Sequence, residues 1–180
     1  SRGTTSMEYD SRGNLTKHTD PGGQVTSYTY DANDRMLSWT NPLGQSWTYT
    51  YDANGNLTSY NGPAGEAGRS SYNAKGQLLR FTDAVGNQTD YRYDQFGNLQ
   101  AVTDAKGFAE TYGYDAFGLW LTSVTDRNGF TTQFAYDDNG RVTRITNPDG
   151  THRDMGYDPF ARRTTTDENG GYAFNGLNEY

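Results

Sequence analysis

A segment of about 21 residues is repeated along almost the whole chain, and each copy contains a Tyr-Asp step. Tyr72-Asn73 and Phe174-Asn175 are degenerate copies of that step. A unit this short cannot bury its own apolar side chains, so neighbouring copies have to supply one another's core. The spacing predicts a single repeat array over residues 1–180 with a degenerate or capping end at 159–180. The aspartates of the intact steps are Asp10, Asp31, Asp52, Asp94, Asp115, Asp137 and Asp158.

Each repeat contains two turn signals. The first is Asp-x-x-Gly, in which the glycines are Gly13, Gly55, Gly97, Gly118 and Gly140. The second turn signal begins about ten residues after the first and consists of Asp or Asn followed by Gly three residues later. Asp or Asn at the first position and Gly at the fourth are typical of a type I turn, and all five prolines occupy the second position. The pattern predicts bulged hairpin turns alternating with short strands.

The segment before each Tyr-Asp step alternates aromatic and small residues, as in Tyr49-Thr50-Tyr51. Residues two apart share one face of a strand. After the turn, two large residues follow three apart, such as Leu57 and Tyr60, which would lie on opposite faces of a regular strand. Either a bulge brings them to one face, or both faces are partly covered. The fold class is predicted as all-β, with antiparallel hairpins forming a curved strip.

The repeated side chains are expected to be structural. Tyrosines at equivalent positions predict aromatic ladders along the strip. The tyrosine hydroxyls need hydrogen-bonding partners, and the turn aspartates are expected to supply some of them. The tyrosines of this set are Tyr9, Tyr30, Tyr51, Tyr93, Tyr114, Tyr136 and Tyr157.

Composition excludes several classes of protein. The chain has no cysteine, so it forms no disulfide or thiolate metal site. Its net charge is −7 and no cluster of Lys or Arg occurs, which argues against nucleic-acid binding. No apolar run is long enough to span a membrane. The 15 tyrosines argue against a disordered tail. The first residues, SRGTTSMEYD, suggest a segment of a longer protein.

No residue is predicted to be catalytic, and no metal or cofactor is expected. The acidic loop at Asp52 has Leu57 where a calcium-binding EF-hand loop needs Gly. A catalytic carboxylate pair is usually unique, whereas these aspartates recur in every repeat. Trp39, Trp47 and Trp120 break the repeat and are the residues that could stack on a sugar ligand, although packing within the ladder is the favoured interpretation.

The segments YTYDANGNLTSY, YRYDQFGNLQAVTDAKG and YGYDAFG resemble the YD-repeat, or Rhs-repeat, family. The family includes bacterial Rhs polymorphic toxins, the C components of Tc toxins and teneurins. The resemblance implies a strip that winds into a spiral shell, which in the bacterial members encloses a C-terminal toxin. Some shells carry an aspartyl autoprotease, but YDPFARRT at Tyr157 is interpreted as an ordinary turn, so that activity is not expected here.

The resulting prediction is a non-catalytic wall segment of a secreted or cell-surface bacterial toxin shell. Its partners would be the toxin polypeptide or other shell segments. The alternative is a repeat module that binds carbohydrate or a cell surface. Because a strip has two edge strands, edge-to-edge self-association is also expected.

Overall fold

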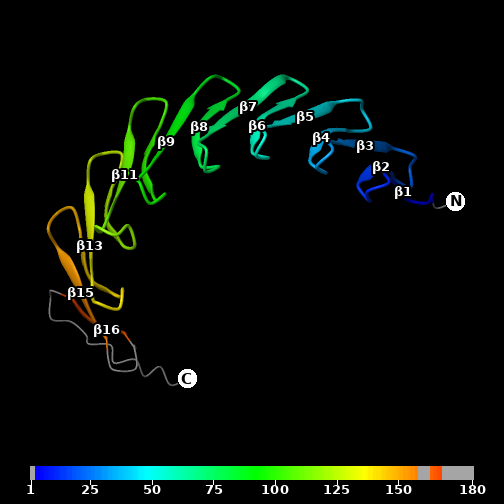
Figure 1. Ribbon diagram of the computed structural model, residues 1–180. Coiled ribbons are helices and arrows are strands. Elements are labelled where there is room, and N and C mark those ends of the chain that lie inside the picture. Colours follow the sequence, from blue (N-terminus) through cyan, green and yellow to red (C-terminus); the bar gives the residue numbers. More distant parts are fainter. Residues whose placement is uncertain (1–2, 158–162, 168–180) are drawn as a thin grey trace, which may run out of the picture. The chain divides into compact units, whose positions relative to one another are not determined.

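The computed structural model describes residues 3–157 and 163–167 and divides into two compact units, Ser1–Thr89 and Asp90–Tyr180 (Figure 1). The first unit contains β1 (Ser6–Tyr9), β2 (Leu15–Thr19), β3 (Val25–Tyr30), β4 (Met36–Thr40), β5 (Ser46–Tyr51), β6 (Leu57–Gly62), β7 (Gly65–Tyr72) and β8 (Leu78–Asp83). Strand β9 (Gln88–Tyr93) begins shortly before the second unit, which continues with β10 (Leu99–Thr103), β11 (Ala109–Tyr114), β12 (Leu121–Thr125), β13 (Thr131–Tyr136), β14 (Val142–Thr146), β15 (His152–Tyr157) and β16 (Arg163–Asp167).

Within each unit the strands lie side by side in chain order, and each pairs antiparallel with the next (Figure 1). The described residues form no helix. The prediction of an all-β chain built from antiparallel hairpins is therefore confirmed. Asp158 lies outside the described residues, and of the end segment 159–180 only β16 is described.

The hairpin turns have the predicted geometry. In the turn after β5, the Gly55 amide donates to the Asp52 carbonyl at 3.1 Å, and the Asp52 amide donates to the Asn56 carbonyl at 2.9 Å. Gly55 has a φ of +90°, a backbone conformation that residues with a Cβ adopt only under strain. The same pair of backbone hydrogen bonds closes the other described turns except the one between β6 and β7, with Trp120 as a more distant acceptor for Asp115 and with Asp34, at a φ of +62°, in the place of glycine in one of them.

A bulge explains the two large residues spaced three apart. Leu57 lies opposite Tyr51 and Tyr60 lies opposite Tyr49, so one extra residue, Thr58, is inserted between them in β6. The insertion turns Leu57 and Tyr60 onto the same face as the tyrosines. The equivalent shift occurs in each of the other hairpins that contain a Tyr-Asp or Tyr-Asn step before β15. Of the two possibilities that the sequence left open, the bulge is therefore the correct one.

The two faces of each unit differ in chemistry. One face, here called the aromatic face, carries Trp47, Tyr49 and Tyr51 in β5 with the residues opposite them, and these side chains are half-buried. The other, here called the hydroxyl face, carries Ser46, Thr48 and Thr50 in β5 and the residues opposite them. Among the described residues the buried apolar side chains are only Ala101 and Met155, so the apolar residues pack along the face of one layer.

The turn glycines generate a stability prediction. Replacing Gly55 with Ala forces a Cβ into positive φ, and we expect the free energy of unfolding to fall by about 1–2 kcal/mol. The matched control is Ala53→Ser in the same turn, where the exposed position tolerates the change within about 0.5 kcal/mol. Urea unfolding monitored by circular dichroism measures both. Equal stability of the two variants would contradict the assigned turn conformation.

Candidate functional site

The tyrosine of the Tyr-Asp step links its own repeat to the previous one. The hydroxyl of Tyr51 donates to the carbonyl oxygen of Met36 at 2.9 Å, and Met36 is the residue that lies opposite Tyr30, the equivalent tyrosine one repeat earlier. Each such tyrosine therefore bonds to the strand immediately before its own, at the residue that lies opposite the equivalent tyrosine of the previous repeat. The same bond, always 15 residues back, joins Tyr72 to Leu57, Tyr114 to Leu99, Tyr136 to Leu121 and Tyr157 to Val142.

The expectation that turn aspartates would accept the tyrosine hydroxyls is wrong for these five tyrosines. Burial raises the pKa of Tyr51, Tyr114 and Tyr136, because it disfavours the charged phenolate. Tyr9 differs from the set, since its side chain is 58% exposed and its hydroxyl contacts the Met7 sulfur at 3.2 Å. Tyr30 and Tyr93 are half-buried, and burial raises the pKa of each.

The turn aspartates are committed to their own turns. Asp52 Oδ1 accepts the amides of Asn54 and Asn56, each at 2.9 Å, and Asp52 Oδ2 accepts the Asn56 side-chain amide at 2.9 Å. The side-chain amide of Asn56, followed by its backbone amide, lowers the pKa of Asp52. At Asp31 and Asp137 an arginine takes the place of Asn56, through Arg35 and Arg141. A lowered pKa is the opposite of what a general acid needs at neutral pH.

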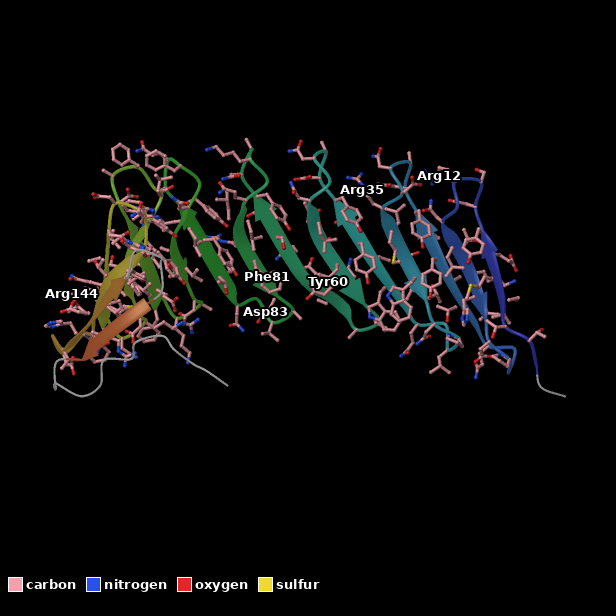
Figure 2. The ribbon with its side chains drawn as sticks, turned by 90° about the horizontal axis from the view of Figure 1, so that it is seen from below. Arg12, Arg35, Tyr60, Phe81, Asp83 and Arg144 are labelled. Atoms are coloured by element: carbon pink, nitrogen blue, oxygen red, sulfur yellow. The ribbon has the colours of Figure 1, made fainter. Side chains whose placement is uncertain are left out.

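At Asp31 and Asp94 the side chain four residues later also contacts the next Tyr-Asp turn. Arg35 Nη1 lies 3.3 Å from the carbonyl oxygen of Asp52, and its guanidinium lies 5.0 Å from the centre of the Tyr51 ring. Asn98 Nδ2 donates to the Gly118 carbonyl at 2.7 Å. Figure 2 shows Arg12 and Arg35 at the edge of the first unit where these turns lie, with Asp83 at the opposite edge. The sequence analysis missed this contact, whose only signal is a polar or cationic side chain recurring at that position.

Packing against the preceding repeat gives a second reason for glycine in two of these turns. A Cβ placed on Gly118 would lie 2.4 Å from the Phe96 ring, and one on Gly140 would lie 2.9 Å from Trp120 Nε1. At Gly118 and Gly140 the turn glycine therefore serves two purposes, positive φ and space for a side chain of the preceding repeat. Gly13 and Gly55 have the same positive φ.

The tryptophans occupy different surroundings. Trp39 and Trp47 lie opposite each other in β4 and β5, with ring centroids 3.9 Å apart and planes inclined by 3°. Trp39 Nε1 also donates to the Tyr49 hydroxyl at 3.2 Å. Trp120, in the second unit, packs against Tyr136 at 5.6 Å. All three indoles are half-buried, and Trp39 and Trp47 each cover one ring face of the other.

Gly68 interrupts the aromatic face of the first unit, next to the irregular turn that joins β6 to β7. Gly68 in β7 lies opposite Tyr60 and is buried. A Cβ on Gly68 would lie 2.6 Å from the Tyr60 ring and 2.9 Å from the Phe81 ring, so the two rings, labelled in Figure 2, share the space above it. The absence of a side chain in β7 thus lets aromatic residues from β6 and β8 approach each other.

Polar groups that could support chemistry are dispersed. Tyr112 donates a hydrogen bond to Glu110, which raises the pKa of the tyrosine to about 12. His152 Nε2 lies 3.6 Å from Asp154 Oδ2, and Arg144 makes a two-pronged ion pair with the same carboxylate. In residues 3–157 and 163–167, no group of three or more His, Cys, Asp or Glu side chains is arranged to hold a metal ion. That part of the chain also contains no helix long and apolar enough to cross a membrane.

Comparison with known proteins gives one family and a set of distant structures. The profile of the family described as RHS Repeat matches residues 9–38, 30–67, 72–109, 98–131, 114–152 and 136–172. The crystal structure of TcdB2-TccC3-TEV is 17% identical, with a TM-score of 0.47, over 94% of this chain and 11% of that one. The Photorhabdus luminescens Tc holotoxin pore carrying TccC3-D651A is 17% identical, with a TM-score of 0.42, over 94% of this chain and 13% of that one. A search of curated proteins gave no match.

The chain therefore spans about a tenth of the length of these two structures.

The tyrosine ladder generates a prediction for Tyr51→Phe. The substitution keeps the ring and removes the hydrogen bond to Met36, so we expect the free energy of unfolding to fall by about 0.5–1.5 kcal/mol. Tyr28→Phe is the matched control, because Tyr28 lies on the same face and its hydroxyl has no hydrogen bond with the described residues. Chemical unfolding of both variants measures the difference, and equal losses would show that the Tyr51 bond contributes nothing.

The turn aspartates generate a pH prediction. The pKa values of Asp10, Asp52 and Asp83 are lowered from 3.8, with the side-chain amides of Asn14, Asn56 and Asn87 as the largest cause. Their stabilising effect is therefore complete above about pH 4 and is lost as the pH falls through the lowered folded-state values. Urea midpoints measured from pH 7 to pH 2 should decline only in the acidic part of that range.

The variant Asp52→Asn tests whether the turn carboxylate causes that decline. Asn73 occupies the equivalent turn and accepts the amides of Lys75 and Gln77 at 2.9 and 3.0 Å, so asparagine preserves the turn. The variant should show a smaller loss of stability on acidification than the wild type. An identical acid profile would mean that other groups control it.

Proposed function

The chain belongs to the RHS repeat family, and we propose that it is a wall segment of a repeat shell that encloses a C-terminal toxin polypeptide in a secreted or cell-surface bacterial protein. RHS repeats cover most of the sequence, and the molecule is a structural repeat module. What we propose beyond that description is that the array encloses a toxin polypeptide and that the protein is secreted or lies at the cell surface. The 180-residue array would be one part of the wall, joined at its ends to other shell segments.

The observation that carries the proposal is that Thr and Ser hydroxyls on the hydroxyl face form hydrogen bonds with one another across neighbouring strands. Thr29 and Ser38 are hydrogen-bonded at 2.7 Å, Thr40 and Ser46 at 2.7 Å, and Thr50 and Ser59 at 2.6 Å. These side chains satisfy one another across neighbouring strands. The resulting surface is polar and, over β3 to β6, uncharged, while charged side chains elsewhere on this face pair with one another, as Lys17 does with Glu8 and Arg144 with Asp154.

Such a surface suits confinement of a polypeptide without binding it. A wall that presented exposed apolar side chains to the cargo would gain about 25 cal/mol for each Å² of apolar area covered and would retain the cargo on release. The hydroxyl face offers little apolar area to hold the cargo, and we therefore assign it to the cargo side of the wall. The mechanism is steric, with the Tyr-Asp steps acting as structural elements and no residue assigned to catalysis.

The second candidate function is binding of carbohydrate or a cell surface through Trp39, Trp47 and Trp120. Half-exposed indoles favour it, since aromatic rings can stack on sugars. The close stacking of Trp39 on Trp47 removes one face of each ring from any ligand, which makes this pair a poorer platform than a single exposed indole. We therefore rank it below the shell. Edge-to-edge pairing of strips is a further proposed interaction of the same array.

Limited proteolysis of the full parent protein tests the shell. We expect its C-terminal region to resist protease in the intact protein and to be cleaved when residues 1–180 of this segment are deleted. The control variant is Tyr28→Phe, which leaves the wall intact and should leave protection unchanged. Protection that persists after deletion would contradict enclosure by this segment, and a glycan array with Trp39→Ala would then test the second candidate.

A further inference from the structure

Two adjoining hollows open at one edge of the second unit, between the turn that joins β12 to β13 and the turn that joins β14 to β15. They share Phe130, Asn147 and Pro148, and one of them, of about 470 Å³, is also lined by Asp126 and Asp149. Phe130 is 59% exposed. The hollows together, here called the Asp126 groove, combine an aromatic ring, a proline and carboxylate oxygen atoms.

Asp126 has one carboxylate oxygen available in this groove. Its Oδ1 accepts the amides of Asn128 and Phe130 at 2.8 and 3.0 Å, as in the other turns. In most Tyr-Asp turns a side chain four residues later donates to Oδ2, as Asn56 does at Asp52, but the residue at that place here is Phe130, which has no donor. No hydrogen bond or ion pair from the described residues reaches Asp126 Oδ2.

The preceding repeat shows which group fits this position. Asp104 is equivalent to Asp126 and Phe108 to Phe130, and again the phenylalanine cannot donate to the aspartate. There Arg127, at the second position of the following turn, places Nη1 3.4 Å from Asp104 Oδ2. In the Asp126 groove the residue equivalent to Arg127 is Pro148, which lines the hollow but has no charge.

We propose that the Asp126 groove binds an arginine side chain of a second polypeptide, which takes the position that Arg127 occupies one repeat earlier. The guanidinium would pair with Asp126 Oδ2, and its planar face could lie on the exposed Phe130 ring. Asp149 at the rim adds negative charge that attracts a cation. The net charge of −7 favours a basic partner over an acidic one.

The probe is N-acetyl-arginine amide, titrated into the ¹⁵N-labelled 180-residue chain and followed by two-dimensional NMR. We expect saturable shifts of the Asn128 and Phe130 amides, because both donate to Asp126. One ion pair and one ring contact at a solvent-exposed site imply a dissociation constant on the order of 1 mM or weaker. N-acetyl-citrulline amide, which has nearly the same shape and no charge, should produce no saturable shift at these amides.

Two substitutions at the groove separate an arginine site from general charge attraction. Asp126→Asn keeps the turn, since Asn147 occupies the same place in the next one, and should weaken binding by about two- to fivefold. Pro148→Arg supplies the missing guanidinium from within and should abolish binding of the probe. Asp20→Asn is the matched control, because Asp20 also precedes a repeat with proline, Pro42, but has Gln24 in the place of Phe130. It should leave binding unchanged.

The preceding repeat offers the reverse experiment. Arg127→Ala should free Asp104 Oδ2 and create a second set of shifts at Lys106 and Phe108, whose amides donate to Asp104. Equal binding of the citrulline probe, unchanged affinity of Asp126→Asn, or continued binding to Pro148→Arg would each overturn the proposal. Should Pro148→Arg fail to fold, Asp126→Asn and Arg127→Ala still decide it.

Discussion

A sheet with one layer has to stabilise itself through contacts between neighbouring strands, and in this chain the Tyr-Asp tyrosine makes a contact of that kind that recurs along each unit. Its ring packs on the aromatic face, and its hydroxyl donates to a carbonyl of the strand immediately before its own, as Tyr51 does to Met36. Each bond contributes only about 1 kcal/mol, but it recurs along each unit. Stability is then close to a sum of nearest-neighbour terms, as in other repeat proteins.

The bulge and the turn follow from that constraint. Without the extra residue in β6, Leu57 and Tyr60 would face opposite sides, and the aromatic face would lose one of the two large residues that each repeat provides there. The turn glycine leaves room for a side chain from the repeat before, as at Gly118 beneath Phe96. Both the positive φ of the turn and the packing between repeats therefore require glycine at Gly118.

The features that could be predicted from the sequence are those encoded by residues close together in the chain. Asp52 and Gly55 lie within one turn, so spacing alone predicted its hairpin. The tyrosine hydroxyl was assigned to the wrong partner, because its acceptor lies 15 residues away and is a backbone carbonyl, which no side-chain pattern identifies. The contact of Arg35 with the next turn was missed for the same reason.

Sites in a repeat protein arise where one copy departs from the others. Trp39 and Trp47 depart by adding rings, and those rings stack on each other. The Asp126 groove differs by lacking a guanidinium group, since Pro148 stands where the preceding repeat has Arg127. Because the repeats share one backbone conformation, the Arg127–Asp104 ion pair shows the contact that Asp126 lacks in the next repeat. For that reason the chemistry of a partner can be inferred from the protein's own repeats, and the inference is strongest where a single side chain distinguishes the two copies.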